Sequence, residues 1–457
     1  MQRTRRDDEK ILGKVPDTKP EVEGARSGGL ALAQHSLKRT EALVDSGKAM
    51  LVENARVTRD KPMKIIAILE DDSGAGGGFN QALNAILQMR GLCEGRFGFE
   101  VFTTRSANLP HLVRIGLKAH VFPWSTTDRL VRRLSASGWW HSVQARIKLV
   151  GPLEKALLEH GCDLVYFVAP GNASAGLQKL NYITTIWDLC HRDAPEFPEV
   201  RDFNTFFIRE RHLRNTLGPA VAVLTDSEQL AGAAARRYGI DPDRFLPMPF
   251  APSPFIDQAH STSKDAVLGK HRLEEGYFFY PAQFWAHKNH IRILEALLLL
   301  KADGWKPRVV FSGKDNGGRA HLEAFVSQND LQEQVIFLGF VPAEDLRGLY
   351  EGSTAVVMPT YFGPTNLPPL EAWSLRKPLV YSAHLAGQAG DAALLIDPDN
   401  ANELATAMKR CNDPGVRARL VDSGVARLEY FATKRESAEK ELLRRLDQFA
   451  ARLRCWK

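Results

Sequence analysis

Short apolar runs alternate along this chain with stretches whose apolar residues recur at helical spacing. The clearest case is KIIAILEDDSGAGGGFNQALNAIL at 64–87, which predicts a strand at 64–70, a glycine-rich turn and then a helix. Further strands are predicted at 99–103, 163–168, 182–187 and 221–225, and then at 277–280, 308–311, 334–338, 355–358 and 378–381. Strands that alternate with helices predict an α/β fold with parallel sheets covered by helices on both faces.

Segments that lack this periodicity divide the chain. Residues 1–63 mix charges of both signs with Gly, Pro and Ser, and we expect a partly disordered N-terminal extension. Residues 256–271 carry the composition of a linker. The pattern therefore predicts an N-terminal domain at 64–255 and a C-terminal domain at 272–433, with a closing basic helix in 434–457. Two such domains place a cleft between the carboxyl ends of their sheets, where ligands bind.

Composition narrows the class of protein only modestly. The 457 residues are 44% hydrophobic and 25% charged, as in ordinary globular proteins, and the net charge of +6 suits an anionic substrate or membrane surface. Five cysteines without a CxxC pair argue against a disulfide framework or a zinc site. No apolar run approaches the roughly 20 residues that cross a bilayer, and no secretory signal is evident. We therefore expect a cytoplasmic protein.

The glycine-rich turn allows three interpretations. Gly74, Gly76 and Gly78 form GxGxG, but the dinucleotide fingerprint GxGxxG requires a glycine where Phe79 stands. The turn could instead be a tight bend that needs positive φ angles. It could also expose backbone amides at a helix N-terminus, which approach an anion closely. The turn by itself leaves these alternatives open.

More specific motifs lie in the second half of the chain. Several stretches resemble the retaining glycosyltransferases of family 4, with the stronger resemblance from Tyr280 onward. They are DDSGAGGGFN at 71–80, YPAQFWAHKNHIRILEAL at 280–297, SGKD at 312–315, FLGFVPAEDLRGLY at 337–350 and MPTYFGPTNLPPLEAWSLRKPLV at 358–380. The resemblance implies the GT-B fold, in which two Rossmann-like parallel-sheet domains face each other across a cleft. It also implies that the C-terminal domain holds most of a nucleotide-sugar donor.

The donor side of the site follows from this resemblance. A sugar nucleotide leaves a diphosphate, whose developing charge needs a fixed cation or aimed N–H groups. Lys288 matches the lysine of the family's diphosphate clasp, whereas Gln283 stands at the position of its arginine and offers only a neutral N–H donor. Glu371 matches the second glutamate of the family's Glu-x7-Glu signature, which implies binding of the ribose hydroxyls. Gly363 replaces the first glutamate.

Backbone groups are expected to complete the donor site. A helix is predicted to start near Pro368, and the turn before it should meet phosphate or sugar oxygens through Pro364, Thr365, Asn366 and Leu367. On the opposite domain, the glycine turn is expected to close over the donor diphosphate through Gly76, Gly77 and Gly78, with a side-chain contact from Asn80.

The N-terminal domain is expected to hold the acceptor. In YITTIWDLCHRDAPEFPEV at 182–200, Asp188 and Leu189 match a family segment that ends in His-Asp-Leu. Asp188 is therefore a candidate catalytic residue together with Lys288 and Glu371. Trp187, at the histidine position, could stack on a sugar or belong to the core. His191 could reach the same cleft, although a lone histidine is more often structural.

A basic segment at 128–148 raises the question of a membrane surface. It places Arg132 and Arg133 near Trp139 and Trp140, a combination that suits an anionic membrane. The same residues are also compatible with a solvated helix face whose tryptophans pack in the core, so both interpretations stay open.

We predict a retaining, metal-independent glycosyltransferase. It would move a sugar, with mannose suggested by the resemblance, from a GDP- or UDP-sugar to a saccharide or lipid-linked saccharide in polysaccharide, lipopolysaccharide or glycolipid synthesis. We expect no tightly bound cofactor, no metal and no nucleic-acid partner, and a cytoplasmic or peripheral membrane location. The alternatives are a nucleotide-sugar epimerase of the same fold, an NAD-dependent oxidoreductase that uses the glycine turn, and a sugar-nucleotide-binding module without activity.

Overall fold

The computed structural model describes residues 61–72, 76–135, 143, 146, 148–256 and 261–457. Most of the predicted N-terminal extension and the pair Trp139 and Trp140 lie outside these residues. The chain separates into two units, Met1–Pro62 and Met63–Lys457, and the description below concerns the second unit.

The first sheet has seven parallel strands in the order β3-β2-β1-β4-β5-β6-β7. Alternate residues of its central strand β1 face opposite sides, because successive side chains of a strand point to opposite faces. Ile65, Ala67 and Leu69 belong to one hydrophobic core, and Ile66 and Ile68 belong to another. The strands are β1 (Lys64–Leu69), β2 (Gly98–Thr103), β3 (Ala119–Val121), β4 (Leu164–Phe167), β5 (Asn181–Thr185), β6 (Ala222–Thr225) and β7 (Phe245–Pro247).

Helices cover both faces of this sheet, as a parallel sheet requires. One face packs against α2 (Gly77–Cys93), α3 (Leu109–Arg114) and the end of α18 (Pro414–Leu453), and the other against α6 (Pro152–Glu159), α9 (Thr205–Thr216) and α10 (Glu228–Tyr238). The connections contain α4 (Thr126–Ser135), α7 (Cys190–Asp193), α8 (Pro198–Arg201) and the single turns η2 (Ser106–Asn108), η3 (Asn172–Gly176), η4 (Asp202–Asn204), η5 (Pro242–Arg244) and η6 (Pro254–Ile256).

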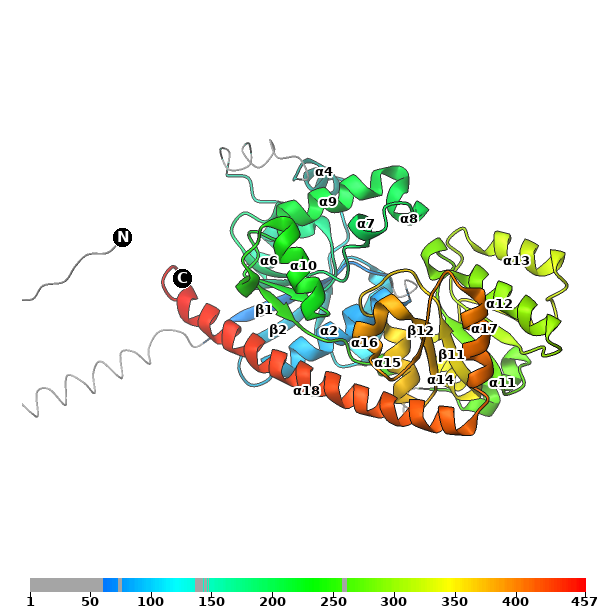
Figure 1. Cartoon of the computed structure of the whole chain (residues 1–457). Coiled ribbons are helices and arrows are strands. Elements are labelled where there is room, and N and C mark those ends of the chain that lie inside the picture. Colours follow the sequence, from blue (N-terminus) through cyan, green and yellow to red (C-terminus); the bar gives the residue numbers. More distant parts are fainter. Residues whose placement is uncertain (1–60, 73–75, 136–142, 144–145, 147, 257–260) are drawn as a thin grey trace, which may run out of the picture. The chain divides into compact units, whose positions relative to one another are not determined.

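The second sheet has six parallel strands in the order β10-β9-β8-β11-β12-β13. They are β8 (Tyr277–Pro281), β9 (Val309–Ser312), β10 (Val335–Gly339), β11 (Ser353–Met358), β12 (Leu379–Ser382) and β13 (Leu394–Ile396). Around them lie α11 (Lys264–His271), η8 (Ala286–Lys288), α12 (His290–Ala302), α13 (Arg319–Gln328), α14 (Ala343–Gly352), α15 (Leu367–Ser374), η9 (Ala383–Leu385), α16 (Ala386–Ala389) and α17 (Ala401–Arg410). We call the parts built on the first and second sheets the N-terminal half and the C-terminal half (Figure 1).

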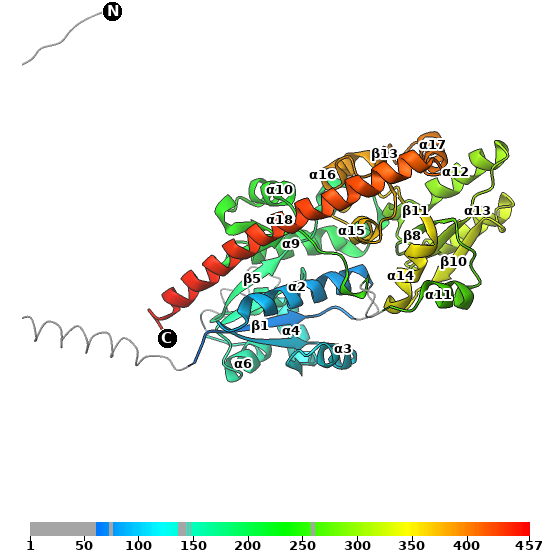
Figure 2. The same cartoon turned by 90° about the horizontal axis from the view of Figure 1, so that it is seen from below.

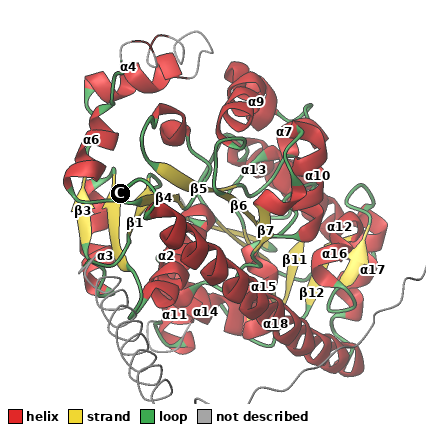
Figure 3. Ribbon diagram, turned by 90° about the vertical axis from the view of Figure 1, so that its left-hand side faces the viewer, coloured by secondary structure: helices red, strands yellow, loops and turns green. Residues whose placement is uncertain are grey.

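One long helix joins the two halves. The 40-residue α18 packs in the C-terminal half through Leu420 and enters the core beside β1 through Leu442 and Leu446. Figure 2 shows it in red alongside α2, and Figure 3 shows it crossing in front of both sheets. The helix begins at Pro414, well before residue 434, because the Asp413 carboxylate caps it by accepting hydrogen bonds from the first-turn amides.

The predicted fold class, two parallel α/β sheets, is confirmed. All the predicted strands are present, whereas the sequence pattern did not reveal β3, β7 and β13, which have three residues each. Within the described part of the chain, every helix is too short or too polar to pass through a lipid bilayer.

Candidate functional site

A cavity of about 520 Å³ lies where segments from both sheets converge. Its lining residues follow β1, β5, β8, β9 and β11, so they come from the carboxyl ends of parallel strands in both halves. The cavity brings together most of the predicted site residues, namely Gly76, Gly77, Gly78, Asn80, Trp187, Asp188, Gln283, Lys288, Thr365, Asn366, Leu367 and Glu371.

The glycine turn approaches the opposite half closely. Gly76 has φ +68°, and a Cβ at this position would lie 3.2 Å from the Gln283 amide nitrogen. A Cβ on Gly78 would lie 3.5 Å from the ring of Trp187. The helix α2 starts at Gly77 without a side-chain cap, and the three lining glycines, which have no side chains, leave only backbone at this wall of the cavity. Gly74, the first glycine of the dinucleotide-like pattern, lies outside the described residues.

Lys288 is the last residue of η8, the first helical element after β8. Its ammonium group donates a hydrogen bond to Asn366 Oδ1 at 3.2 Å, which brings the predicted clasp lysine to the start of α15. Burial lowers the pKa of Lys288 to about 8, so the group is mostly protonated at pH 7. The Asn366 backbone amide already donates to Gln388, and Asn366 therefore contributes to the cavity through its side chain.

Glu371 lies in the second turn of α15 and lines the same cavity. Tyr350 donates a hydrogen bond of 2.6 Å to Glu371 Oε2, which fixes the orientation of the carboxyl group. Burial raises the pKa of Glu371 to about 7. Its carboxyl group can therefore gain or lose a proton near neutral pH.

The structure gives a backbone reason for Gly363. Its φ is +110°, a conformation that side chains rarely adopt, and a Cβ would lie 2.8 Å from Asn366 Oδ1. Asn366 also donates to the Gly363 carbonyl at 2.9 Å. A glutamate at 363 would therefore require a different turn before α15.

Gln283 takes part in a small amide network. Its Oε1 accepts hydrogen bonds of 2.9 Å from the Trp285 indole and from the Asn316 amide. The neighbouring cavity wall carries Lys314, an exposed amine directly after β9. Sequence reasoning did not single out Lys314, although it lies inside the SGKD stretch. Its position after a buried strand was the available signal.

Asp188 is held as an anion on the N-terminal side of the cavity. It pairs with Arg209 and accepts hydrogen bonds from the Cys190 amide at 3.0 Å and from the Cys190 thiol. Burial by itself would raise the pKa of Asp188, but the charge of Arg209 and the bonds from Cys190 outweigh it and lower the pKa. Arg209 lines the cavity from α9, which no local sequence signal indicated.

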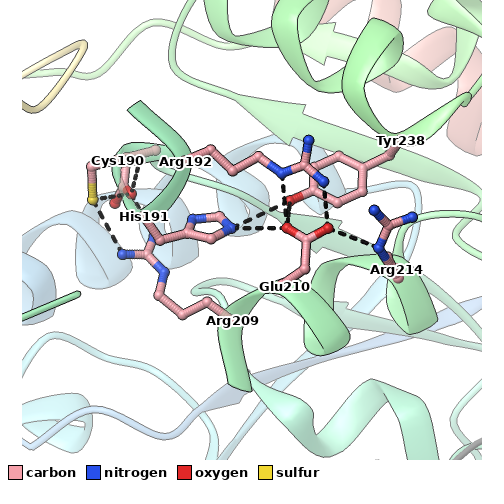
Figure 4. Close-up of polar contacts among 8 residues, drawn as sticks. Cys190, His191, Arg192, Arg209, Glu210, Arg214 and Tyr238 are labelled. Carbon is pink, nitrogen blue, oxygen red and sulfur yellow. Dashed lines mark hydrogen bonds and ion pairs between the residues drawn. The ribbon is translucent and has the colours of Figure 1, made fainter. Parts of the chain in front are cut away.

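His191 does not line the cavity. It is fully buried, and its Nε2 lies 3.3 Å from Glu210, which also binds Arg192, Arg214 and Tyr238 (Figure 4). Burial lowers the pKa of His191, which favours the neutral ring. This placement favours the structural alternative for His191 over contact with an acceptor.

Several predicted residues lie elsewhere or outside the described part of the chain. Pro364 lines a neighbouring cavity, to which Phe362, Gly363 and Thr365 also contribute. Arg132 and Arg133 lie in α4, and Trp139 and Trp140 are not described, so the membrane prediction stays a prediction. Across the described residues, no cluster of three His, Cys, Asp or Glu side chains could hold a metal ion.

Two facing parallel-sheet halves with a shared cavity at their strand ends define the GT-B architecture. The C-terminal half matches the family model "Glycosyl transferases group 1" over residues 275–413. The solved structure of Anabaena Alr3699/HepE with UDP-glucose aligns with a TM-score of 0.61 at 16% identity, over 83% of this chain and 99% of that one. WaaG, a glycosyltransferase of lipopolysaccharide biosynthesis, aligns with a TM-score of 0.56 at 14% identity, over 83% and 98%. These structures confirm the predicted GT-B fold.

Curated relatives point in the same direction. O-antigen chain mannosyltransferase B of Escherichia coli is 27% identical over 255 residues, which are 55% of this chain and 66% of the relative. O-antigen chain mannosyltransferase RfbU of Salmonella typhimurium is 24% identical over 209 residues, or 44% and 55%. The chain thus spans less than two thirds of the length of these relatives. The matched family and both relatives are glycosyltransferases, which agrees with the predicted enzyme class and does not favour an epimerase or an oxidoreductase.

Proposed function

We propose that this protein is a retaining glycosyltransferase that moves mannose from a GDP- or UDP-activated donor to a saccharide or lipid-linked saccharide. The observation that carries this proposal is the meeting of Lys288 with the start of α15 inside one cavity, at 3.2 Å from Asn366 Oδ1. Mannose and a role in surface polysaccharide synthesis are supported by the names of the O-antigen mannosyltransferase relatives.

The donor diphosphate would lie between Lys288 and the glycine turn. When the bond between the anomeric carbon and the diphosphate breaks, negative charge develops on the leaving oxygen, and a preorganised cation stabilises that charge. Lys288 supplies one positive charge. Lys314 supplies a second at the rim of the same cavity, where the neutral Gln283 cannot. The amides of Gly77 and Gly78 close the opposite wall.

The nucleoside would be held by Glu371. A carboxylate accepts two hydrogen bonds from a vicinal diol such as the ribose hydroxyls. The bond from Tyr350 prevents the carboxyl group from turning away, so the group is already oriented before the ligand arrives. Ribose binding favours the ionised form of Glu371, whose pKa of about 7 leaves it partly ionised at neutral pH.

The acceptor would bind against Trp187, Asp188 and Asn80 on the N-terminal side. In the reaction, the acceptor hydroxyl oxygen forms a bond to the anomeric carbon on the face that the diphosphate leaves. Its proton passes to the departing phosphate oxygen. Asp188 is paired with Arg209 and has a lowered pKa, so it orients the acceptor rather than serving as the base.

Thermal-shift measurements with UDP, GDP and NAD test the ligand class. Stabilisation by a nucleoside diphosphate, and none by NAD, is the expected result, because a ligand that binds only the folded state raises its stability. Stabilisation by NAD alone would reverse the proposal.

Transfer assays with Lys288→Ala test the diphosphate role. The variant should lose about 10²- to 10³-fold in turnover, the usual loss when one group that stabilises transition-state charge is removed. Lys306→Ala is the matched control, because Lys306 is exposed and does not line the cavity. Equal turnover of the two variants would remove Lys288 from the mechanism.

A further inference from the structure

A short segment of the N-terminal half contacts the C-terminal half beside the cavity. The Glu199 carboxylate, from α8, accepts a hydrogen bond of 3.0 Å from the His287 backbone amide through Oε1. The same oxygen pairs with His287 Nδ1. The two residues lie 88 positions apart in the sequence, and both line the cavity. This pair is therefore a polar contact between the acceptor half and the donor half.

Aromatic rings surround this contact. The His287 ring stacks on Phe362, with centroids 3.8 Å apart and an interplanar angle of 12°. The ring centroid of Phe197, from the N-terminal half, lies 5.4 Å from that of Phe362 and 5.3 Å from that of Tyr361. The Glu199 and His287 side chains are only 9% and 11% exposed. The hydrogen bonds to Glu199 are thus largely shielded from water, which strengthens them.

The charges of the pair favour this arrangement. Burial lowers the pKa of His287 to about 4, so the ring is neutral at pH 7 and can donate from Nδ1. Burial by itself would raise the pKa of Glu199, but the hydrogen bonds from His287 outweigh it and lower the pKa. The contact is therefore a charge-assisted bond from a neutral histidine to a carboxylate. Glu199 Oε2 is buried without a hydrogen-bond partner among the described residues, so Oε1 carries the interaction.

The contact lies directly next to Lys288 in the sequence, because His287 is the preceding residue. The His287 carbonyl accepts hydrogen bonds from the Tyr361 amide at 2.9 Å and from the Thr360 hydroxyl at 3.3 Å. The backbone N–H and the carbonyl of His287 are therefore both held by hydrogen bonds, and the next residue is Lys288. The position of Lys288 within its single-turn helix depends on these anchors, one of which comes from the other half of the molecule.

We propose that Glu199 is a positioning residue that couples closure of the two halves to the placement of Lys288. When the N-terminal half closes, Glu199 binds His287 and orders η8, and Lys288 then faces the donor diphosphate. The inference rests on the proposed function, because it takes Lys288 as the group that binds the diphosphate. In this inference Glu199, a residue on the acceptor side, controls the donor site.

Three variants separate this role from a general effect on folding. Glu199→Ala removes the acceptor oxygen, whereas Glu199→Gln keeps an oxygen that can accept both bonds from His287. Glu196→Ala is the matched control, because Glu196 is an exposed neighbour of the same segment. We expect Glu199→Ala to lower kcat about tenfold or more with little change in the acceptor KM, since small misplacements of a catalytic group have effects of this size. Glu199→Gln should keep more of the wild-type kcat than Glu199→Ala, because it retains the acceptor oxygen without the charge, and Glu196→Ala should stay close to the wild type.

The double variant Glu199→Ala/Lys288→Ala gives the sharpest test. If Glu199 acts through Lys288, the double variant should be no slower than Lys288→Ala, because groups that act as a unit are not additive. Losses that multiply in the double variant would overturn the inference. Glu199→Ala turnover equal to that of Glu196→Ala would overturn it as well.

Closure itself can be measured without turnover. Small-angle X-ray scattering should show a larger radius of gyration for Glu199→Ala than for Glu199→Gln, because only the first loses the contact between the halves. Equal radii would contradict the coupling of Glu199 to closure. A wild-type protein that binds neither UDP nor GDP in calorimetry would contradict the proposed function instead, so the two failures are distinguishable.

Discussion

Burial shifts the pKa values of two cavity residues, Lys288 and Glu371, toward neutral pH. The ordinary pKa values of lysine and glutamate lie near 10.4 and 4.3, far from neutral pH. Burial brings the pKa of Lys288 down to about 8 and that of Glu371 up to about 7. The charge of the site therefore responds to pH over the physiological range, although neither residue type does so in water.

Nucleotide binding should weaken as the pH rises through about 8. Below this value Lys288 carries its proton and attracts the diphosphate, and above it the free protein holds a neutral amine. Titration calorimetry with UDP or GDP between about pH 7 and 9.5 measures the effect, because a phosphate with a second pKa of about 6 is already ionised there. Lys288→Ala should show no decline in affinity above about pH 8, where Glu371, with a pKa of about 7, is already ionised. A slope that persists in that variant would assign the titration to another group.

Gly363 and Gly76 illustrate what residue identity alone can predict. The sequence identified both positions, one as a departure from a family motif and one as part of a glycine turn. It did not reveal that φ at Gly363 is +110° or that the Gln283 side chain approaches Gly76. These features depend on atoms contributed by other segments, so they required the folded chain.

At the scale of the element, α15 packs against α18, and this contact holds α15 beside the cavity. A Cβ on Gly424 of α18 would lie 2.6 Å from Cδ1 of Trp373 in α15. Trp373 is fully buried, and its indole donates to the Ala392 carbonyl at 3.0 Å, so the ring has little freedom to move. The close approach of the two helices thus depends on the absence of a side chain at 424.

Gly424→Ala should destabilise the protein, although alanine favours helix. The gain in helix propensity is about 1 kcal/mol, whereas forcing a methyl group into a packed contact costs about 1–3 kcal/mol, and Gly424→Val should cost more. Gly232→Ala in α10 is the control, because the nearest atom there is the end of the Arg236 side chain at 3.3 Å. Urea unfolding measures both. If Gly424→Ala has the same free energy of unfolding as Gly232→Ala, the Trp373 ring can shift to make room for the methyl group.

At the scale of the whole molecule, α18 makes the two halves share one helix. Leu420 belongs to the core of the C-terminal half, whereas Leu442, Leu446 and Phe449 belong to the core beside β1. Loss of contacts at one end of the helix should therefore affect the part of the chain at the other end.

Leu446→Ala should lower the free energy of unfolding by about 2–4 kcal/mol, the usual effect of removing a buried leucine side chain. Leu446 is only 1% exposed. Lys440→Ala is the control, because Lys440 lies on the same helix with 74% of its side chain exposed. Thermal unfolding followed by tryptophan fluorescence should show a lower midpoint for Leu446→Ala only. An unchanged midpoint would mean that the end of α18 contributes little to the core.

The sequence by itself determined the two parallel α/β sheets, and most of the candidate site residues that it indicated line the cavity. Strand and helix periods are local, and residues after buried parallel strands collect at one sheet edge, so both could be predicted without coordinates. Only the tertiary structure decided the pairing of Glu199 with His287, the pairing of Asp188 with Arg209 and the protonation of Lys288 and Glu371. These depend on burial and on contacts between distant segments, and no local pattern in the chain encodes either.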